Sequence, residues 1–88
     1  MSSQPRTLLI TGASSGIGRA VALVAARGGD HVVLVARDET ELKNVARQAE
    51  AAGAASATVF AADVGDDAAM ARCVEETVVR HGHVVLQG

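Results

Sequence analysis

A glycine-rich stretch at 11–18, with the sequence TGASSGIG, lies between an apolar run and an amphipathic run. The free N–H groups at a helix start, together with the helix dipole, attract anions such as a pyrophosphate. Gly12 permits a tight turn after a strand, Gly16 leaves space for phosphates, and Gly18 lets the helix pack close to the sheet. The stretch therefore predicts a phosphate-binding turn between a strand and a helix.

Apolar runs and helical periodicities alternate along the rest of the chain. Short apolar runs at 7–11, 32–36, 57–62 and 83–86 are typical of strands buried in a parallel sheet. Amphipathic patterns predict helices at 16–27, from Asp38 to Gly53, and from Asp66 to His81. This alternation predicts an α/β fold, a Rossmann-type doubly wound parallel sheet with strand order 3-2-1-4. We expect one partial domain over 1–88, truncated after the fourth strand.

Each predicted helix has one apolar stripe that we expect to face the sheet. The stripes are Ile17, Ala20, Val21 and Val24 in the first helix, Leu42, Val45, Ala46 and Ala49 in the second, and Met70, Cys73, Val74, Thr77 and His81 in the third. Asp38 and the Asp66-Asp67 pair are predicted to cap the second and third helices.

Composition excludes several classes of function. Eight basic and ten acidic residues, scattered along the chain with a net charge of -2, argue against a nucleic-acid or anionic-membrane surface. Met1–Arg6 lacks a secretory apolar segment, and no run approaches the roughly eighteen apolar residues of a membrane helix. The single cysteine, Cys73, excludes an internal disulfide, and we expect a buried, inert thiol. A soluble cytoplasmic protein is the expectation.

Other candidate chemistry is weaker. His81 and His83 could place two imidazoles close together, but no third ligand accompanies them, so no metal site is expected. Ser14 and Ser15 are interpreted as hydroxyls of the phosphate-binding turn, because no histidine base has an evident route to them.

The motif T-G-x-x-x-G-x-G, complete from Thr11 to Gly18, resembles the nucleotide motif of the short-chain dehydrogenase/reductase family. The resemblance covers nearly all of the chain, and Arg37 and the pair Asp63-Val64 also fit the family pattern. It implies that Asp63 meets the adenine amino group and that Val64 holds the ring. The alternative is that Asp63 only closes a turn at the strand end.

Arg37 favours NADP(H) over NAD(H). An enzyme that prefers NAD usually carries a carboxylate at the end of the second strand, where this chain has Ala36. The Arg37 guanidinium would pair with a 2'-phosphate instead. Two alternatives remain: Arg37 is a solvated surface residue, or Asp38 is the acidic ribose ligand. The predicted cofactor site comprises Thr11, Gly12, Ser14, Ser15, Gly16, Ile17, Gly18, Arg37, Asp63 and Val64.

No catalytic residue is assigned. Members of the family that the chain resembles carry a Ser, a Tyr and a Lys beyond the fourth strand, whereas this chain has no tyrosine and a single lysine, Lys43, on an outward helical face. The resemblance implies the cofactor-binding part of an NADP(H)-dependent oxidoreductase, which transfers hydride between nicotinamide and a carbonyl or alcohol carbon and is inactive by itself. The alternative is a free-standing nucleotide-binding or interaction module.

The end of the chain suggests a truncation or a frame change, because the fourth strand stops at Gly88 without the longer strand and the turn of the family. That strand, normally interior, would become an edge carrying Val84, Val85 and Leu86. We therefore expect weak stability and self-association through this edge.

Overall fold

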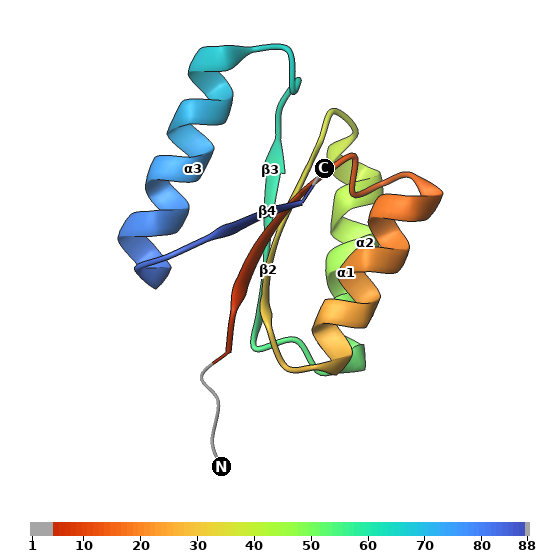
Figure 1. Cartoon of the computed structure of the whole chain (residues 1–88). Coiled ribbons are helices and arrows are strands. Elements are labelled where there is room, and N and C mark those ends of the chain that lie inside the picture. Colours follow the sequence, from red (N-terminus) through yellow and green to blue (C-terminus); the bar gives the residue numbers. More distant parts are fainter. Residues whose placement is uncertain (1–4, 88) are drawn as a thin grey trace.

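The computed structural model describes residues 5–87, and strands and helices alternate throughout this range (Figure 1). In chain order the elements are β1 (Thr7–Thr11), α1 (Gly16–Arg27), β2 (His31–Ala36), α2 (Glu39–Ala52), β3 (Ser56–Ala61), α3 (Asp67–His81) and β4 (Val85–Gln87). The ends of the expected domain, 1–88, lie outside the described residues.

The strands form one sheet in the order β3-β2-β1-β4, and every neighbouring pair is parallel. The predicted fold class and strand order are confirmed. The fourth strand begins at Val85 and not at His83. Helix α3 ends at His81, its C-cap Gly82 has φ of 85°, and His83 and Val84 form the connection from there to β4. In the register of β4 with β1, Val85 pairs with Leu8.

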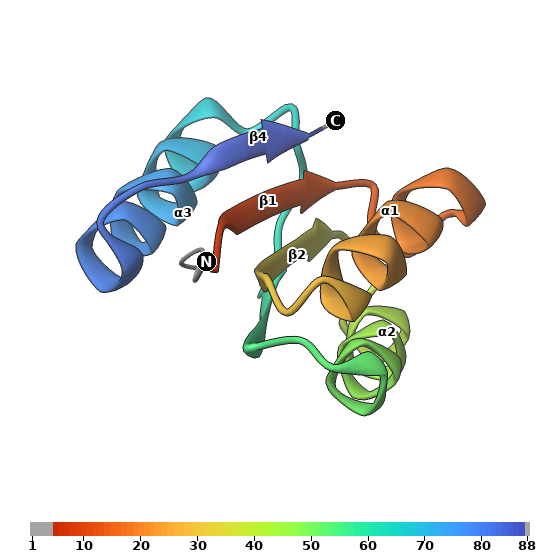
Figure 2. The same ribbon diagram turned by 60° about the horizontal axis from the view of Figure 1, so that its bottom comes forward.

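The helices cover the two faces of the sheet unequally. Helices α1 and α2 lie together on one face, while α3 lies on the other (Figure 2). Alternate strand residues point to opposite faces, so Ile10 and Leu34 join the core under α1 and α2, whereas Leu9 and Val33 join the core under α3. The core under α3 is the smaller one.

Aspartates begin two of the helices as predicted. Asp38 Oδ1 accepts a hydrogen bond from the Glu41 N–H at 3.1 Å, and Asp66 Oδ1 accepts one from the Ala69 N–H at 3.1 Å. A cap of this kind contributes about 1 kcal/mol. Gly53, in the left-handed conformation with φ of 119°, ends α2.

The predicted apolar stripe of α1 is wrong. Ile17 is 83% exposed and Val24 is 64% exposed. The residues that α1 buries are Gly18, Ala22, Ala25 and Ala26. A Cβ atom on Gly18 would lie 2.2 Å from the carbonyl oxygen of Gly12, so this helix approaches the turn too closely for large inward side chains. In α2 and α3 the buried residues lie on the predicted stripes, with Ala69 as an addition.

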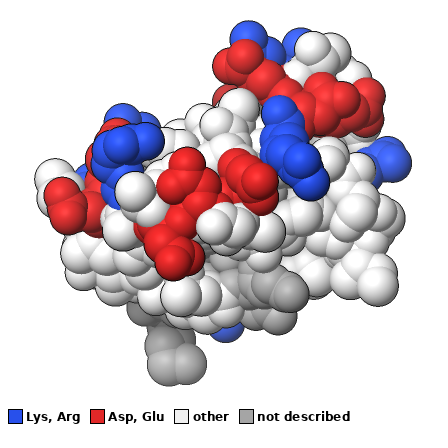
Figure 3. Space-filling model, turned by 90° about the horizontal axis from the view of Figure 1, so that it is seen from above, with Lys and Arg blue, Asp and Glu red and all other residues white. Residues whose placement is uncertain are grey.

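Charged side chains of both signs share the surface. Figure 3, seen from above, shows acidic and basic residues on the same face of the molecule. Within residues 5–87, no helix has both the length and the apolar character that crossing a membrane requires.

Candidate functional site

The glycine-rich turn is fixed onto the ends of two strands. Gly12 has φ of 65°, a left-handed conformation that glycine adopts without strain. Its carbonyl oxygen accepts hydrogen bonds from the Ser15 N–H at 3.0 Å and from the Ser15 hydroxyl at 2.7 Å. The N–H of the fully buried Ala13 donates to the Val35 carbonyl at 3.2 Å. The turn is therefore held by β1 and β2 together.

Two glycines of the motif have opposite surroundings. Gly18 packs against backbone atoms of the turn, because its added Cβ would lie 2.2 Å from Gly12 O and 3.1 Å from the Ala13 Cα. Its closest neighbours thus belong to the turn itself. Among residues 5–87, an added Cβ on Gly16 would meet no atom within 4 Å other than those of its chain neighbours and of the nearby backbone of α1. Gly18 is required by packing, whereas Gly16 leaves open space at the start of α1.

The start of α1 carries no side-chain cap. Ser15 is its N-cap residue, but its hydroxyl is bonded to Gly12 O and makes no cap hydrogen bond, and the first turn has no acidic residue. The other two helices are capped by Asp38 and Asp66. Of the three helices within residues 5–87, α1 is thus the one whose positive dipole end is not offset by an aspartate, which leaves that end available to an anion.

An open pocket of about 410 Å³ lies at this helix start. Its lining residues are Ile10, Thr11, Gly12, Ser15, Ile17, Gly18, Val21 and Val64. The structure therefore brings Val64, from the connection after β3, to the glycine turn. The other predicted residues, Ser14, Gly16, Arg37 and Asp63, do not line this pocket. Ser14 is half-buried in the turn, and Gly16 lines an adjoining groove along α1 of about 490 Å³.

Arg37 lies at the carboxyl end of the strands, the same end of the sheet as the glycine turn. Thr11 at the end of β1 is paired with Val35, and the exposed Arg37 follows the end of β2 directly. Asp38, the alternative ribose ligand, instead caps α2 through its Oδ1 atom. Among the described residues Arg37 thus has no side-chain hydrogen bond or ion pair, while the neighbouring Asp38 carboxylate caps its own helix.

Asp63 closes the turn after β3. Its Oδ1 accepts a hydrogen bond from the Gly65 N–H at 2.9 Å, and its carbonyl oxygen accepts one from the Asp66 N–H at 2.9 Å. The turn-forming alternative for Asp63 is therefore observed. This turn also places Val64, which is 54% exposed, beside the glycine motif.

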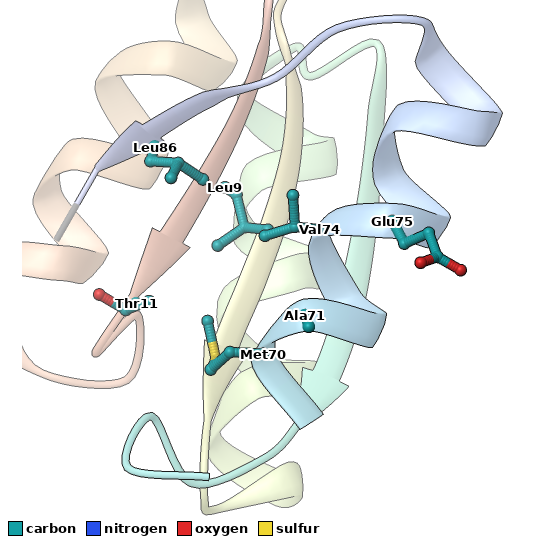
Figure 4. A pocket seen from close by; sticks show the side chains of 7 residues that line it. All are labelled: Leu9, Thr11, Met70, Ala71, Val74, Glu75 and Leu86. Atoms are coloured by element: carbon teal, nitrogen blue, oxygen red, sulfur yellow. The ribbon is translucent and has the colours of Figure 1, made fainter. Parts of the chain in front are cut away.

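A second open pocket, of about 590 Å³, lies on the opposite face between α3 and the β1-β4 edge. Figure 4 shows Leu9 and Leu86 from the strands and Met70 and Val74 from α3 around it, while Glu75 points away. Sequence reasoning assigned Met70 and Val74 to the core but missed the pocket. Only the strand order could have revealed it, because the pocket lies beside the unpaired side of β4.

Cys73 and the histidines form no recognisable catalytic group. Cys73 is buried as predicted, and burial raises the pKa of its thiol above the ordinary value. The ring of His81 packs against His31 with 4.3 Å between centroids. Within residues 5–87, no set of three or more His, Cys, Asp or Glu residues could hold a metal ion.

The parallel sheet, the glycine turn after its first strand and the uncapped start of α1 define a Rossmann-type α/β protein. The short chain dehydrogenase family model matches residues 6–86, and the chain belongs to that family.

Similar proteins share this part of their chains. An 11-beta-hydroxysteroid dehydrogenase of Pinus massoniana is 39% identical over 79 residues, which are 90% of this chain and 22% of that protein. A metagenomic short-chain oxidoreductase in complex with NADP superposes with a TM-score of 0.85 at 38% identity, over 92% of this chain and 37% of its own. The L-sorbose reductase from Gluconobacter frateurii, complexed with NADPH and L-sorbose, gives 0.80 at 36% identity, over 90% and 30%. The chain thus spans between 22% and 37% of the length of these relatives.

Proposed function

We propose that this chain is the cofactor-binding part of an NADP(H)-dependent short-chain oxidoreductase, as one partial domain over 1–88. The observation that supports the proposal best is the open helix start behind the Thr11–Gly18 turn. There the uncapped start of α1 borders the pocket of about 410 Å³, and the open space at Gly16 belongs to the adjoining groove along α1. This helix start offers a pyrophosphate the two things that its binding needs, which are backbone N–H donors and room to approach the backbone closely.

The role of each turn residue follows from its place in the structure. Gly12 and Ser15 form the turn, Gly16 leaves the space for the phosphates, and Gly18 brings α1 close. The remaining members, Thr11, Ser14 and Ile17, border the bound cofactor. We assign Val64 to the adenine ring, because its exposed side chain lines the same pocket. Asp63 is assigned to the adenine amino group.

We assign the 2'-phosphate to Arg37. The exposed Arg37 follows β2 at the carboxyl end of the sheet, where the glycine turn also lies. Ala36 offers no carboxylate to a ribose hydroxyl. Two solved relatives, described above, are complexed with NADP and NADPH, which supports the same cofactor class. NADP(H) is therefore the proposed cofactor, in preference to NAD(H).

The complete enzyme is proposed to move hydride between nicotinamide and a carbonyl or alcohol carbon. This chain alone is proposed to bind without turnover. It has no tyrosine, and its single lysine, Lys43, lies on the outer side of α2, where Nζ is 3.9 Å from a Glu39 carboxylate oxygen. Within the described part of the chain, no tyrosine or lysine lines the pocket at the glycine turn.

A titration with NADPH tests the proposal. The chain contains no Trp or Tyr, so the fluorescence of NADPH can be followed with almost no protein background. We expect saturable binding, and an unchanged NADPH signal with folded protein would contradict it. Oxidation of NADPH by a panel of carbonyl compounds, above the rate without protein, would refute the claim that the chain lacks catalysis.

We also propose self-association through β4. Val85 is 44% exposed and Leu86 is 62% exposed on the outer strand of the sheet. An apolar edge strand with unpaired backbone groups pairs readily with another chain. A second copy of this chain is the proposed partner.

A further inference from the structure

Two histidines meet at the end of the sheet opposite the glycine turn. His31 is the first residue of β2, and His81 is the last residue of α3. Their rings lie 4.3 Å apart between centroids with an interplanar angle of 36°. This contact joins the C-terminal end of α3 to the sheet.

Neutral rings suit this contact. The Nδ1 atom of His31 is 2.7 Å from the Ser56 hydroxyl of β3, so one ring is oriented by a neighbouring strand. The Nε2 atom of His81 is buried and has no hydrogen-bond partner among the described residues. A proton on His81 would therefore place a charge in a position without an acceptor, directly against a second imidazole.

The charged groups around the pair give little compensation. From α3, Arg80 and Glu76 line a small cavity together with His81. His83 lies in the connection from α3 to β4. Like Arg80, it lowers the pKa of His81, because a positive charge on either residue repels a proton on His81. Before β2, Asp30 is already paired with Arg6 at 3.4 Å. Glu76 is thus the one nearby carboxylate outside an ion pair among these groups.

We propose that the His31–His81 contact is a pH-sensitive attachment of α3, which acidification releases from the sheet. Burial lowers the pKa of His81 from its ordinary value of 6.5, and the neighbouring His31, Arg80 and His83 lower it further. The unfolded chain then binds a proton at higher pH than the folded chain does. Stability from this contact is present above about pH 6.5 and is lost as the pH falls below it.

Release of the C-terminal end of α3 would also loosen the edge strand β4. Only Gly82, His83 and Val84 separate His81 from the start of β4. The φ of 85° at Gly82 sets the direction in which the chain leaves α3. Freeing the end of α3 therefore also frees β4 and opens the core around the buried Cys73.

The thiol of Cys73 supplies the test. The rate at which 4,4'-dithiodipyridine labels Cys73 would be measured from about pH 7.5 to 5.5 in the wild-type chain, His81→Gln and His83→Gln. Comparing variants at the same pH cancels the chemistry of the reagent. We expect the ratio of the Cys73 labelling rate in the wild type to that in His81→Gln to increase by about threefold to tenfold on acidification. His83→Gln removes an exposed imidazole as a control, and because burial of His81 and its contact with His31 outweigh the effect of His83, this variant should keep most of the wild-type pH dependence.

Far-UV circular dichroism separates release from unfolding. The helical signal should persist at about pH 5.5 while Cys73 becomes reactive, because α1 and α2 remain packed. A wild-type ratio that does not change with pH would overturn the proposal, and so would loss of the helical signal in step with labelling. Should His81→Gln fail to fold, His81→Asn removes the same imidazole with a smaller side chain and must flatten the same pH dependence.

Discussion

Gly18 can be replaced only at a cost to folding. An alanine Cβ would lie 2.2 Å from Gly12 O and 2.8 Å from its carbonyl carbon, and both are backbone atoms. The turn must therefore shift. We expect Gly18→Ala to lower the free energy of unfolding by about 1–3 kcal/mol, measured by urea denaturation. A variant as stable as the wild type would show that the turn yields without cost.

Gly16 is the matched position with the opposite expectation. Its added Cβ meets no atom within 4 Å, and alanine is the better helix former by about 1 kcal/mol in a helix interior. We expect Gly16→Ala to leave the urea midpoint unchanged or raised, but to weaken NADPH binding at least about tenfold, a loss of roughly 1.4 kcal/mol. Unchanged affinity would mean that the phosphates lie elsewhere.

Arg37 decides between the two cofactors. We expect Arg37→Ala to weaken NADPH binding about tenfold to a hundredfold, because the charged hydrogen bonds to the 2'-phosphate are lost. NADH has no such phosphate, so its affinity should not change. Equilibrium titration of both cofactors measures the difference. Equal weakening of both would remove Arg37 as the 2'-phosphate ligand.

At the scale of the elements, substitutions at the N-cap of α2 can distinguish whether Asp38 stabilises the helix or binds the cofactor ribose. Asp38 Oδ1 caps the helix through the Glu41 N–H, so Asp38→Ala should lower the free energy of unfolding by about 0.5–2 kcal/mol. Asparagine caps equally well, and Asp38→Asn should retain stability. NADH affinity, measured in the same variants, should stay constant. Weaker NADH binding by the well-folded Asp38→Asn variant would restore the ribose-ligand alternative.

The elements also show how far sequence reasoning reaches. The bounds of α1 and β1 and the caps of α2 and α3 follow from local patterns, and the strand order follows from the general rule for doubly wound sheets. All of them are observed. The buried face of α1 does not follow, because large apolar residues were expected inward. Ile17 and Val24 are exposed instead, since the depth available beneath a helix depends on how closely its backbone approaches the turn.

The candidate site divides in the same way. The turn at Thr11–Gly18 is local in sequence, so its motif predicts it. The position of Val64 beside that turn was expected only through the family resemblance, and the pocket it helps to form depends on the strand order. The pocket at Leu86 and Met70 and the His31–His81 contact join residues far apart in the chain, which no local pattern reveals.

On the scale of the whole molecule, the two sides of β4 differ from the rest of the surface. The 590 Å³ pocket with Leu86 lies on the α3 face, and the groove of 490 Å³ with Leu8 and Val24 lies on the α1 face. The apolar surface thus continues around the edge strand, and an associating copy can cover strand edge and pockets together.

This surface predicts self-association that one charge abolishes. A lysine on an edge strand opposes pairing with another chain, so Val85→Lys should lower the apparent mass seen by sedimentation towards that of a monomer. Val79→Lys is the matched control, because Val79 is 82% exposed on α3 and makes the same change of charge away from β4. We expect the control to associate as the wild type does. Association that persists in Val85→Lys, or that both variants lose equally, would show that the copies meet elsewhere or repel through net charge alone.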